Sequence, residues 1–220
     1  MKTKTKKVLF GIMFWIVSLT WGIIMTSIGL LITGALNLVK LIGNLTGHDL
    51  AIKTHKNGCS LITEVGGNWG GVELGAVALC GNYSKNSPTW FNHTRKHEFG
   101  HALQHLIFGP LFIFVVAIPS ASRYWIDEFK GRKNKNIFAI CVGIALLLIA
   151  GGFAVLAAFT SPWWFILVGF LVIYVAIYLY WMIKVEIPKY DNSAPGYDSI
   201  WFEGSATAWG TKYVDWLEEN

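Results

Sequence analysis

The chain is poor in charged residues and in cysteine. Only 14% of its 220 residues are Asp, Glu, Lys or Arg, against about 25% in ordinary soluble proteins. Its three cysteines have neither the spacing of a zinc ribbon nor the number that a disulfide framework needs, so both of these classes are excluded. Hydrophobic residues make up 54% of the chain and 11 residues are tryptophan. This composition predicts an integral membrane protein with much surface at the membrane interface.

Basic residues gather next to apolar segments. One cluster, Lys2, Lys4, Lys6 and Lys7, precedes the first apolar run. A second cluster fills a central loop and consists of Arg123, Lys130, Arg132, Lys133 and Lys135. Nucleic-acid binding is one interpretation of such clusters. Lys and Arg that flank apolar segments usually mark the cytoplasmic side of a membrane, and we favour that interpretation over a nucleic-acid partner.

The first segment, residues 1–43, is predicted to enter the membrane. It is almost continuously apolar from residue 8 to residue 42, whereas the apolar core of a cleavable signal peptide has about 7–15 residues. The run is also longer than one span of about 20 residues. We therefore expect either one long anchor or a helical hairpin, with Thr26-Ser27 as a possible break.

The second segment, residues 44–136, begins with a polar, glycine-rich part. Two apolar runs, 59–65 and 72–80, flank a stretch that holds four glycines around an Asn-Trp pair. Such a pattern predicts a β-hairpin. Pairing of the two runs around the glycine-rich turn places Cys59 near Cys80.

Helices are expected in most of the remaining chain. A helix over 93–108 ends at Gly109-Pro110. The short apolar stretch after it closes at Pro119-Ser120 and suits a buried or re-entrant segment. The third segment, residues 137–183, contains two apolar runs long enough to cross a membrane, joined by a tight link, and predicts a transmembrane helical hairpin.

The stretch His97-Glu-Phe-Gly-His101 has the spacing of a zinc-binding motif. On a helix the two imidazoles lie about 400° apart in rotation and about 6 Å apart along the axis, so they project from one face. Both can then hold one metal ion, with Glu98 placed to act as the general base. No histidine follows His105, which excludes the third histidine of a metzincin.

His93 and His105 extend this histidine stripe by one helical turn at each end. Each lies about 6 Å further along the axis, too far from a metal ion held between His97 and His101. We therefore expect these two residues to cap the helix, to support a ligand without binding the metal directly, or to be solvated.

Glu203 is the favoured third ligand. It lies in the fourth segment, residues 184–220, in a helix expected over 199–218 whose small residues would allow close packing on another helix. An acid among aromatic residues is usually placed for a function, although a solvated face of the tail helix remains the alternative. Thr207, one turn later, is a candidate to support a ligand through a hydrogen bond.

These motifs, in this order, resemble a family of small bacterial membrane-associated zincin-like proteins. The matching stretches are Glu73-Leu-Gly-Ala-Val, His97-Glu-Phe-Gly-His-Ala-Leu-Gln104, Gly109-Pro-Leu-Phe-Ile, Ile118-Pro-Ser120 and Trp201-Phe-Glu203-Gly-Ser-Ala206. The resemblance implies that His97, His101 and Glu203 bind Zn²⁺ and that Glu98 is the base. The chain departs from the family at Thr207, where the family commonly has Asn or Asp.

The sequence therefore predicts a mainly α membrane protein with a zincin-like helix pair, a small β-hairpin and an inserted two-helix transmembrane hairpin. Its predicted function is that of a membrane-embedded zinc metallopeptidase that hydrolyses a peptide or protein near the bilayer, with the strand in 72–80 as a docking edge. A zinc-stabilised, non-catalytic scaffold or accessory protein is the alternative. An ion transporter is a third hypothesis, disfavoured because too few spans surround the histidines.

Connectivity also predicts sidedness. Glu203 must reach the histidines, so the tail and the helix over 93–108 share one side of the membrane, or a cavity within it, with the basic central loop. This favours the cytoplasmic side of a bacterial inner membrane. The reaction also needs an oxyanion donor, for which Tyr197, Tyr124 and Arg123 are candidates by residue type alone.

Overall fold

The chain forms two compact units in the computed structural model. Unit 1 comprises Met1–Ile113 and Ile200–Asn220, and unit 2 comprises Phe114–Ser199. The boundaries of these units differ from those of the segments expected from the sequence. The tail segment, residues 184–220, is divided between the two units at Ser199 and Ile200. The structure describes residues 3–67, 69–81, 87–193 and 196–219.

Unit 1 contains a four-stranded sheet with the strand order β1-β2-β4-β3. The strands are β1 (Lys53–Asn57), β2 (Ser60–Val65), β3 (Gly71–Leu74) and β4 (Val77–Gly81). β1 pairs antiparallel with β2, and β3 pairs antiparallel with β4, whereas β2 and β4 are parallel. β3 therefore forms one edge of this sheet.

The predicted pairing of the two apolar runs in one hairpin is wrong. The second run, 72–80, reverses at Gly75 and forms a hairpin of its own from β3 and β4. Gly75 has a φ of +80°, a left-handed conformation that costs glycine little. Because β2 then lies parallel to β4, Cys80 is opposite Glu64 and does not pair with the strand end at Cys59.

One helix covers each face of the sheet. α2 (Ile23–Leu45) approaches β3 and β4 so closely that a Cβ on Gly29 would lie 3.1 Å from the Cβ of Val77. The next residue of β4, Ala78, points to the other face, where α3 (Pro88–Phe108) packs on it. The sheet is thus enclosed between α2 and α3.

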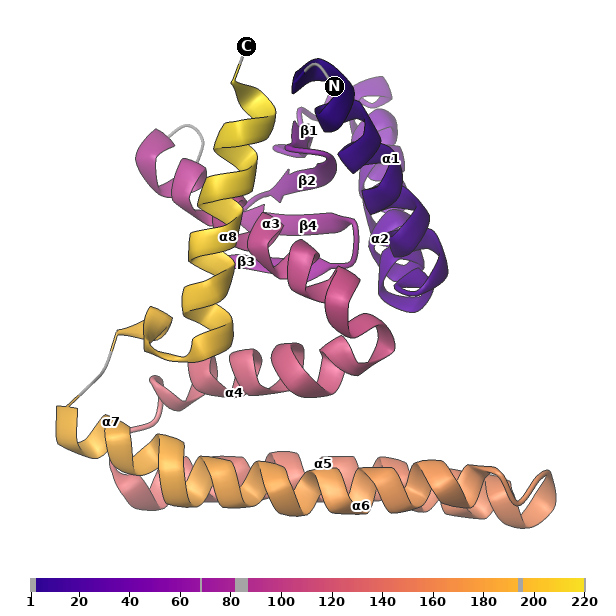
Figure 1. Cartoon of the computed structure of the whole chain (residues 1–220), viewed down its shortest axis with the longest axis vertical. Coiled ribbons are helices and arrows are strands. Elements are labelled where there is room, and N and C mark those ends of the chain that lie inside the picture. The colour runs from indigo at the N-terminus through magenta and orange to yellow at the C-terminus, as the bar shows by residue number, and fades with distance from the viewer. Residues whose placement is uncertain (1–2, 68, 82–86, 194–195, 220) are drawn as a thin grey trace. The chain divides into compact units, whose positions relative to one another are not determined.

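The N-terminal apolar segment is a pair of helices, α1 (Thr3–Thr20) and α2. The break lies at Trp21-Gly22, ahead of the expected Thr26-Ser27, and the chain turns sharply there (Figure 1). A Cβ on Gly22 would lie 2.3 Å from Cε1 of His105, so the ring of His105 requires a glycine at this turn. The apolar run is thus broken into two helices, of which α2 is long and apolar enough to cross a membrane, and the helical-hairpin alternative stays a prediction.

α8 (Trp201–Glu218) runs antiparallel to α3 in close backbone contact (Figure 1). A Cβ on Gly100 of α3 would lie 1.9 Å from the carbonyl oxygen of Ala206, and one on Gly210 of α8 would lie 1.7 Å from that of Lys96. Two glycines, one on each helix, therefore let the backbones touch.

The expected ends of both helices agree with the structure. α3 ends at Phe108 before Gly109, and α8 occupies nearly the whole range expected for the tail helix. α3 begins earlier than expected, at Pro88. Ser87 precedes it and its hydroxyl accepts a hydrogen bond from the Trp90 amide at 3.4 Å, and proline is favoured in the first turn.

The described residues of unit 2 form helices joined by short connections. Its α-helices are α4 (Ile118–Ile126), α5 (Arg132–Phe159), α6 (Trp164–Tyr180) and α7 (Ile187–Ser193). Two π-helical segments, η2 (Ile113–Ala117), whose first residue belongs to unit 1, and η3 (Trp181–Glu186), and one 3₁₀ helix, η4 (Tyr197–Ser199), complete it. η1 (Gly109–Leu111) follows α3 in unit 1. α5 and α6 form the predicted hairpin. The stretch expected to close at Pro119-Ser120 continues instead into α4, because the first turn of a helix tolerates proline.

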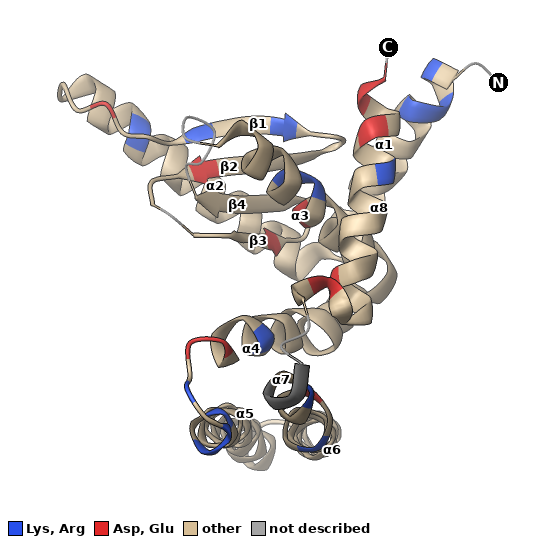
Figure 2. Cartoon of the chain, turned by 90° about the vertical axis from the view of Figure 1, so that its left-hand side faces the viewer, with Lys and Arg blue, Asp and Glu red and all other residues tan. Residues whose placement is uncertain are grey.

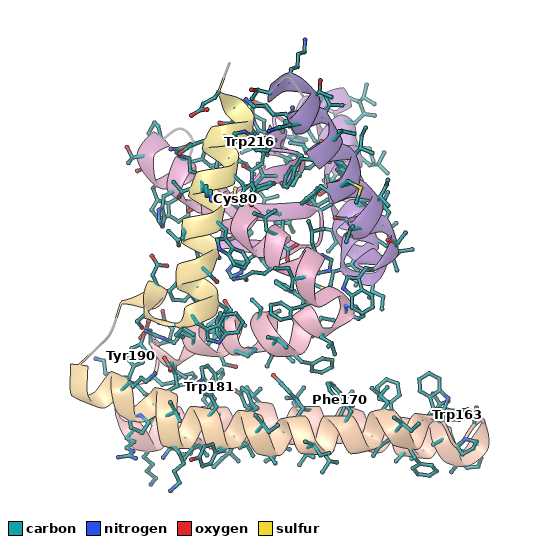
Figure 3. All side chains as sticks on the ribbon, viewed as in Figure 1. Cys80, Trp163, Phe170, Trp181, Tyr190 and Trp216 are labelled. Carbon is teal, nitrogen blue, oxygen red and sulfur yellow. The ribbon has the colours of Figure 1, made fainter. Side chains whose placement is uncertain are left out.

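Within the described residues, three helices are long and apolar enough to cross a membrane: α2, α5 and the continuous helical stretch Trp164–Tyr190. Their outer faces carry exposed large apolar side chains such as Leu31, Leu148 and Ile173. Trp163 lies at the turn between α5 and α6, and Trp181 lies toward the other end of the pair (Figure 3). About 27 Å of helix separates these two tryptophans, close to the thickness of the hydrocarbon core.

The positions of the charged residues also fit a membrane protein. The blue bands of α1 in Figure 2 lie at its N-terminal end, and the rest of α1 is free of Lys and Arg. α2 carries one charged residue, Lys40. Basic residues next to apolar helices are the pattern of a membrane protein, and the exposed apolar faces are compatible with one.

Gly210→Ala tests the contact between α3 and α8. We expect the free energy of unfolding to fall by about 1–3 kcal/mol, because the added methyl group overlaps the Lys96 carbonyl and forces the helices apart. Gly34→Ala is the matched control, since nothing lies within 4 Å of a Cβ at Gly34. Thermal unfolding in detergent compares the two, and equal unfolding temperatures would contradict the proposed packing.

Candidate functional site

α3 and α8 bring three side chains of the metal-binding type to one point. The Nε2 atoms of His97 and His101 are 3.0 Å apart. Oε2 of Glu203 lies 3.1 Å from the first nitrogen and 3.2 Å from the second. His101 and Glu203 are buried, and His97 is partly exposed. The three residues singled out in the sequence as ligands therefore meet in space, across more than 100 residues of chain.

The spacing of these three atoms fits a small divalent ion. A tetrahedral zinc ion with bonds of about 2.0–2.1 Å to nitrogen and oxygen separates its ligand atoms by about 3.3 Å. The observed separations are 3.0–3.2 Å. Two imidazole nitrogens and one carboxylate oxygen are also a donor set that zinc accepts. The residues present can therefore hold such an ion and leave a fourth position for water.

Gln104 determines which nitrogen of His101 carries the proton. Its amide nitrogen donates to the Phe202 carbonyl at 2.6 Å and to the Ser205 hydroxyl at 2.8 Å. Its amide oxygen therefore faces Nδ1 of His101, at 2.8 Å, and accepts the proton from it. The lone pair of Nε2 is then directed at the cluster, as a metal ligand requires.

Thr207 occupies the corresponding position beside the other histidine. Its hydroxyl lies 2.8 Å from Nδ1 of His97. The sequence placed Thr207 near the ligands because it follows Glu203 by one turn, and the structure brings it there. Gln104 was missed as a supporting residue, although its place three residues after His101 puts both side chains on one face of α3.

Electrostatics at the site favour positive charge. Burial alone would lower the pKa of His101, but the Glu203 carboxylate beside it acts in the opposite direction and the pKa is raised overall. Glu203 itself is fully buried. A buried carboxylate that faces two imidazoles is stabilised by a cation between them.

Glu98 lies between the ligand pair and the sheet edge. It is buried, and a Cβ on Gly71 of β3 would lie 2.3 Å from its Oε1. Burial raises the pKa of Glu98, while His97 and His101 partly offset that effect. The carboxyl group thus sits directly against the backbone of the edge strand.

Glu73 is a second buried acid near this site that the sequence did not single out by itself. It lies two residues after Gly71 on β3, so both point to the same face of the sheet, and only 5% of it is exposed. Burial raises its pKa well above the usual value, and the charge of Glu98 raises it further. The backbone amide of Gly75 acts in the opposite direction and lowers the pKa.

The outer histidines of the stripe have different surroundings. His93 is exposed, and its ring centroid is 6.4 Å from that of His97. His105 is fully buried, which lowers its pKa to about 4. Its ring contacts Phe112 at 5.3 Å, and Phe112 in turn contacts His101 at 6.3 Å. Phe112 therefore lies between His105 and the ligand His101 and contacts both rings.

The three candidates for an oxyanion donor belong to unit 2. Arg123 is fully buried and pairs with Glu186 at 3.1 Å. The hydroxyl groups of Tyr197 and Ser120 are 2.9 Å apart. Tyr124 makes a ring contact with Trp125. These contacts all lie within unit 2, whereas the cluster of histidines and Glu203 lies in unit 1.

No family model matches the chain, and no curated protein or solved structure matches it either. The resemblance to the zincin-like family thus stays a prediction based on the order of short motifs. The geometry of the cluster on α3 and α8 carries the functional interpretation.

Proposed function

We propose that the chain is a membrane-embedded, zinc-dependent metallopeptidase that cleaves a peptide or protein segment close to the bilayer. One observation supports this most strongly: the two Nε2 atoms and the Glu203 carboxylate converge at ligand spacing, with the Glu98 carboxyl group beside them. A structural zinc site is usually closed by four protein ligands, whereas a catalytic one keeps a position open. Three ligands and an adjacent acid favour catalysis.

The protein's own groups have distinct parts in this proposal. His97, His101 and Glu203 hold the metal, and Gln104 and Thr207 keep the two imidazoles in the orientation that ligation needs. A bound zinc ion supplies an acidic water and polarises the scissile carbonyl group.

Glu98 moves the proton. Its carboxylate accepts a proton from the attacking water and then donates it to the leaving amine, as a general base and then a general acid. Its raised pKa suits the second role, since a carboxyl group that ionises reluctantly holds the proton until the amine departs. The tight contact with Gly71 keeps the carboxyl group from rotating away.

The edge strand β3 is the proposed docking site for substrate. An extended peptide can add to an open sheet edge through backbone hydrogen bonds. Because Gly71 of β3 touches Glu98, a peptide on this edge passes beside the base. α2, a candidate membrane span, packs on the same strand, so the substrate is proposed to lie near the bilayer. The basic clusters favour the cytoplasmic side of a bacterial inner membrane.

Metal content tests the ligand set. We expect one zinc ion per chain in the purified wild-type protein, measured by inductively coupled plasma mass spectrometry, and loss of that zinc in His97→Ala, His101→Ala and Glu203→Ala. His93→Ala is the control on the same helix, and it should keep its zinc because His93 is exposed beyond the cluster. A wild-type protein free of metal would exclude the proposal.

Thr207→Val tests the support of His97. We expect zinc affinity to fall by about 10–100-fold, as is typical when a hydrogen bond to a ligating histidine is lost. Thr207→Ser keeps the hydroxyl group and should restore the affinity. Competition with a chelator of known affinity measures both, and an unchanged affinity in Thr207→Val would show that this contact does not matter.

Glu98→Gln separates a peptidase from a zinc-stabilised scaffold. A peptidase should keep its zinc and lose cleavage by at least about 100-fold, the typical contribution of a general base. Quantitative sequencing of new peptide termini in native membranes, with wild-type and variant chains compared, detects cleavage without a known substrate. If wild-type and Glu98→Gln membranes yield the same termini while zinc is retained in both, the scaffold function replaces the peptidase.

A further inference from the structure

Most charged residues of unit 2 lie beside one end of the α5–α6 hairpin. Residues 137–183, which form most of the hairpin, include no Asp, Glu, Lys, Arg or His. The stretches that flank them, 123–135 and 184–193, hold seven basic and four acidic residues. Figure 2 views the pair from this end and shows blue bands on both of its members. We call the exposed basic residues here the basic end; they are Lys130, Arg132, Lys133, Lys184 and Lys189.

The packing of α5 on α6 sets the level of these residues along the hairpin. A Cβ on Gly143 of α5 would lie 3.1 Å from Cδ2 of Leu179 of α6, so these two residues face each other. The helices run in opposite directions, and five residues from this contact toward the basic end lead to Phe138 on one helix and to Lys184 on the other. Phe138 and Lys184 are therefore level with each other.

The chain before α5 folds back to the same level. Phe129 stacks on Phe138 with ring centroids 5.0 Å apart, which brings the next residue, Lys130, close to the level of Lys184. Lys184 lies three residues, or about 4.5 Å, beyond Trp181. Tryptophan is enriched where the hydrocarbon core of a bilayer ends, and the headgroup layer beyond it is about 5–8 Å thick. If α5 and α6 cross a membrane, both lysines therefore lie in the headgroup layer.

A buried arginine fixes the helices at this end to one another. Arg123 of α4 is fully buried, and its guanidinium carbon lies 3.5 Å from the centre of the Tyr190 ring of α7. The ammonium group of Lys135 on α5 lies 4.7 Å from the centre of the same ring. α4, α5 and α7 are thereby joined, so the basic end is held on a fixed frame before any ligand binds.

The acidic residues at this end offset only part of its charge. Asp127 and Glu186 both face the guanidinium group of Arg123, at 3.4 and 3.1 Å. Glu186 also lies 3.9 Å from the ammonium group of Lys189, whose side chain stays 56% exposed. Two of the four acids thus pair with Arg123, which is not part of the exposed surface, and the surface itself stays positive.

The basic end continues into an exposed apolar surface. Ile137 and Ile144 of α5 are about half exposed, and so are Tyr124 and Trp125 at the end of α4. Lys and Arg next to exposed Trp and Tyr, at the end of an apolar helix pair, are typical of a membrane–water interface. A nucleic acid would neutralise the charges but leave the apolar part of this surface in water.

We propose that the basic end of unit 2 binds the headgroups of anionic phospholipids. A lysine ammonium group offers three N–H donors and a positive charge, and phosphate oxygens accept such charge-assisted hydrogen bonds. The acyl chains of the same lipid cover the apolar faces of α5 and α6, where Ile144 and Ile173 are exposed. This lipid site goes beyond the proposed peptidase function and does not depend on it.

Titration of the full-length protein in detergent with short-chain phospholipids tests the preference, with binding followed by microscale thermophoresis. Phosphatidylglycerol carries a net negative charge, whereas phosphatidylcholine with the same acyl chains is zwitterionic. Each Lys or Arg near the surface favours the anionic lipid by about 5-fold, so we expect the dissociation constant to be at least about 10-fold lower for phosphatidylglycerol. Raising the salt from about 0.1 to 1 M shortens the screening length from about 10 to 3 Å and should remove most of this difference.

Equal affinity for the two lipids would overturn the proposal. Displacement of bound phosphatidylglycerol by an equal concentration of inorganic phosphate or of an RNA oligonucleotide would overturn it as well, because neither competitor has acyl chains.

A triple variant, Lys130→Gln/Lys133→Gln/Lys184→Gln, tests the location of the site. We expect its dissociation constant for phosphatidylglycerol to rise by about 100-fold, from about 5-fold for each lysine, with little change for phosphatidylcholine. Its unfolding midpoint without lipid should match that of the wild type, since all three lysines are exposed.

The matched control, Lys53→Gln/Lys56→Gln/Lys212→Gln, removes the same charge from exposed residues of unit 1. It should bind phosphatidylglycerol as the wild type does. An equal loss of affinity in both triple variants would show that net charge, and not the basic end, governs binding, and would contradict the proposal.

Discussion

The backbone contact between α3 and α8 is the constraint on which the site depends. The histidines belong to one helix and the glutamate to the other, and about 100 residues of chain separate them. Gly100 and Gly210 allow the two backbones to touch, and this proximity brings the short Glu203 side chain within 3.2 Å of both imidazole nitrogens. Helices at an ordinary distance of 8–10 Å would leave the carboxylate short of the cluster. A charge pair reinforces the contact, since the two terminal guanidinium nitrogens of Arg95 on α3 donate to the carboxylate of Glu218 on α8 at 2.6 and 2.8 Å.

α2 carries an apolar outer face and a polar inner face. α2 turns its small and polar residues, Thr26, Gly29 and Thr33, toward the sheet and exposes large apolar residues such as Leu31. A water-soluble amphipathic helix has the opposite arrangement. The polar face contacts the sheet directly: Thr33 bonds to Thr63 at 3.3 Å, and Thr26 lies against Gly75, at the turn between β3 and β4. One helix thereby combines an apolar outer face, compatible with a membrane, with a polar inner face on the sheet.

Part of this arrangement could be predicted from the sequence, because it depends on local geometry. The spacing of His97 and His101 requires a shared helical face, and the Gly109-Pro110 pair requires a helix end. The pairing of β3 with β4 could not be predicted in this way. It depends on the left-handed backbone of Gly75, which divides the apolar run 72–80 into two strands although the run looks continuous in the sequence. The break at Gly22 depended on the ring of His105, which lies 83 residues later in the chain. Gln104 and Glu73 take their roles from neighbours in space, and no local pattern reveals these neighbours.

Zinc K-edge absorption spectroscopy on the purified protein tests the central claim most directly, because it reports which atoms surround the metal. Two imidazoles, the Glu203 carboxylate and one water predict four nitrogen or oxygen neighbours at about 2.0–2.1 Å, with the multiple-scattering pattern of two histidine rings. Sulfur neighbours at about 2.3 Å, or a shell without histidine, would contradict the site at α3 and α8.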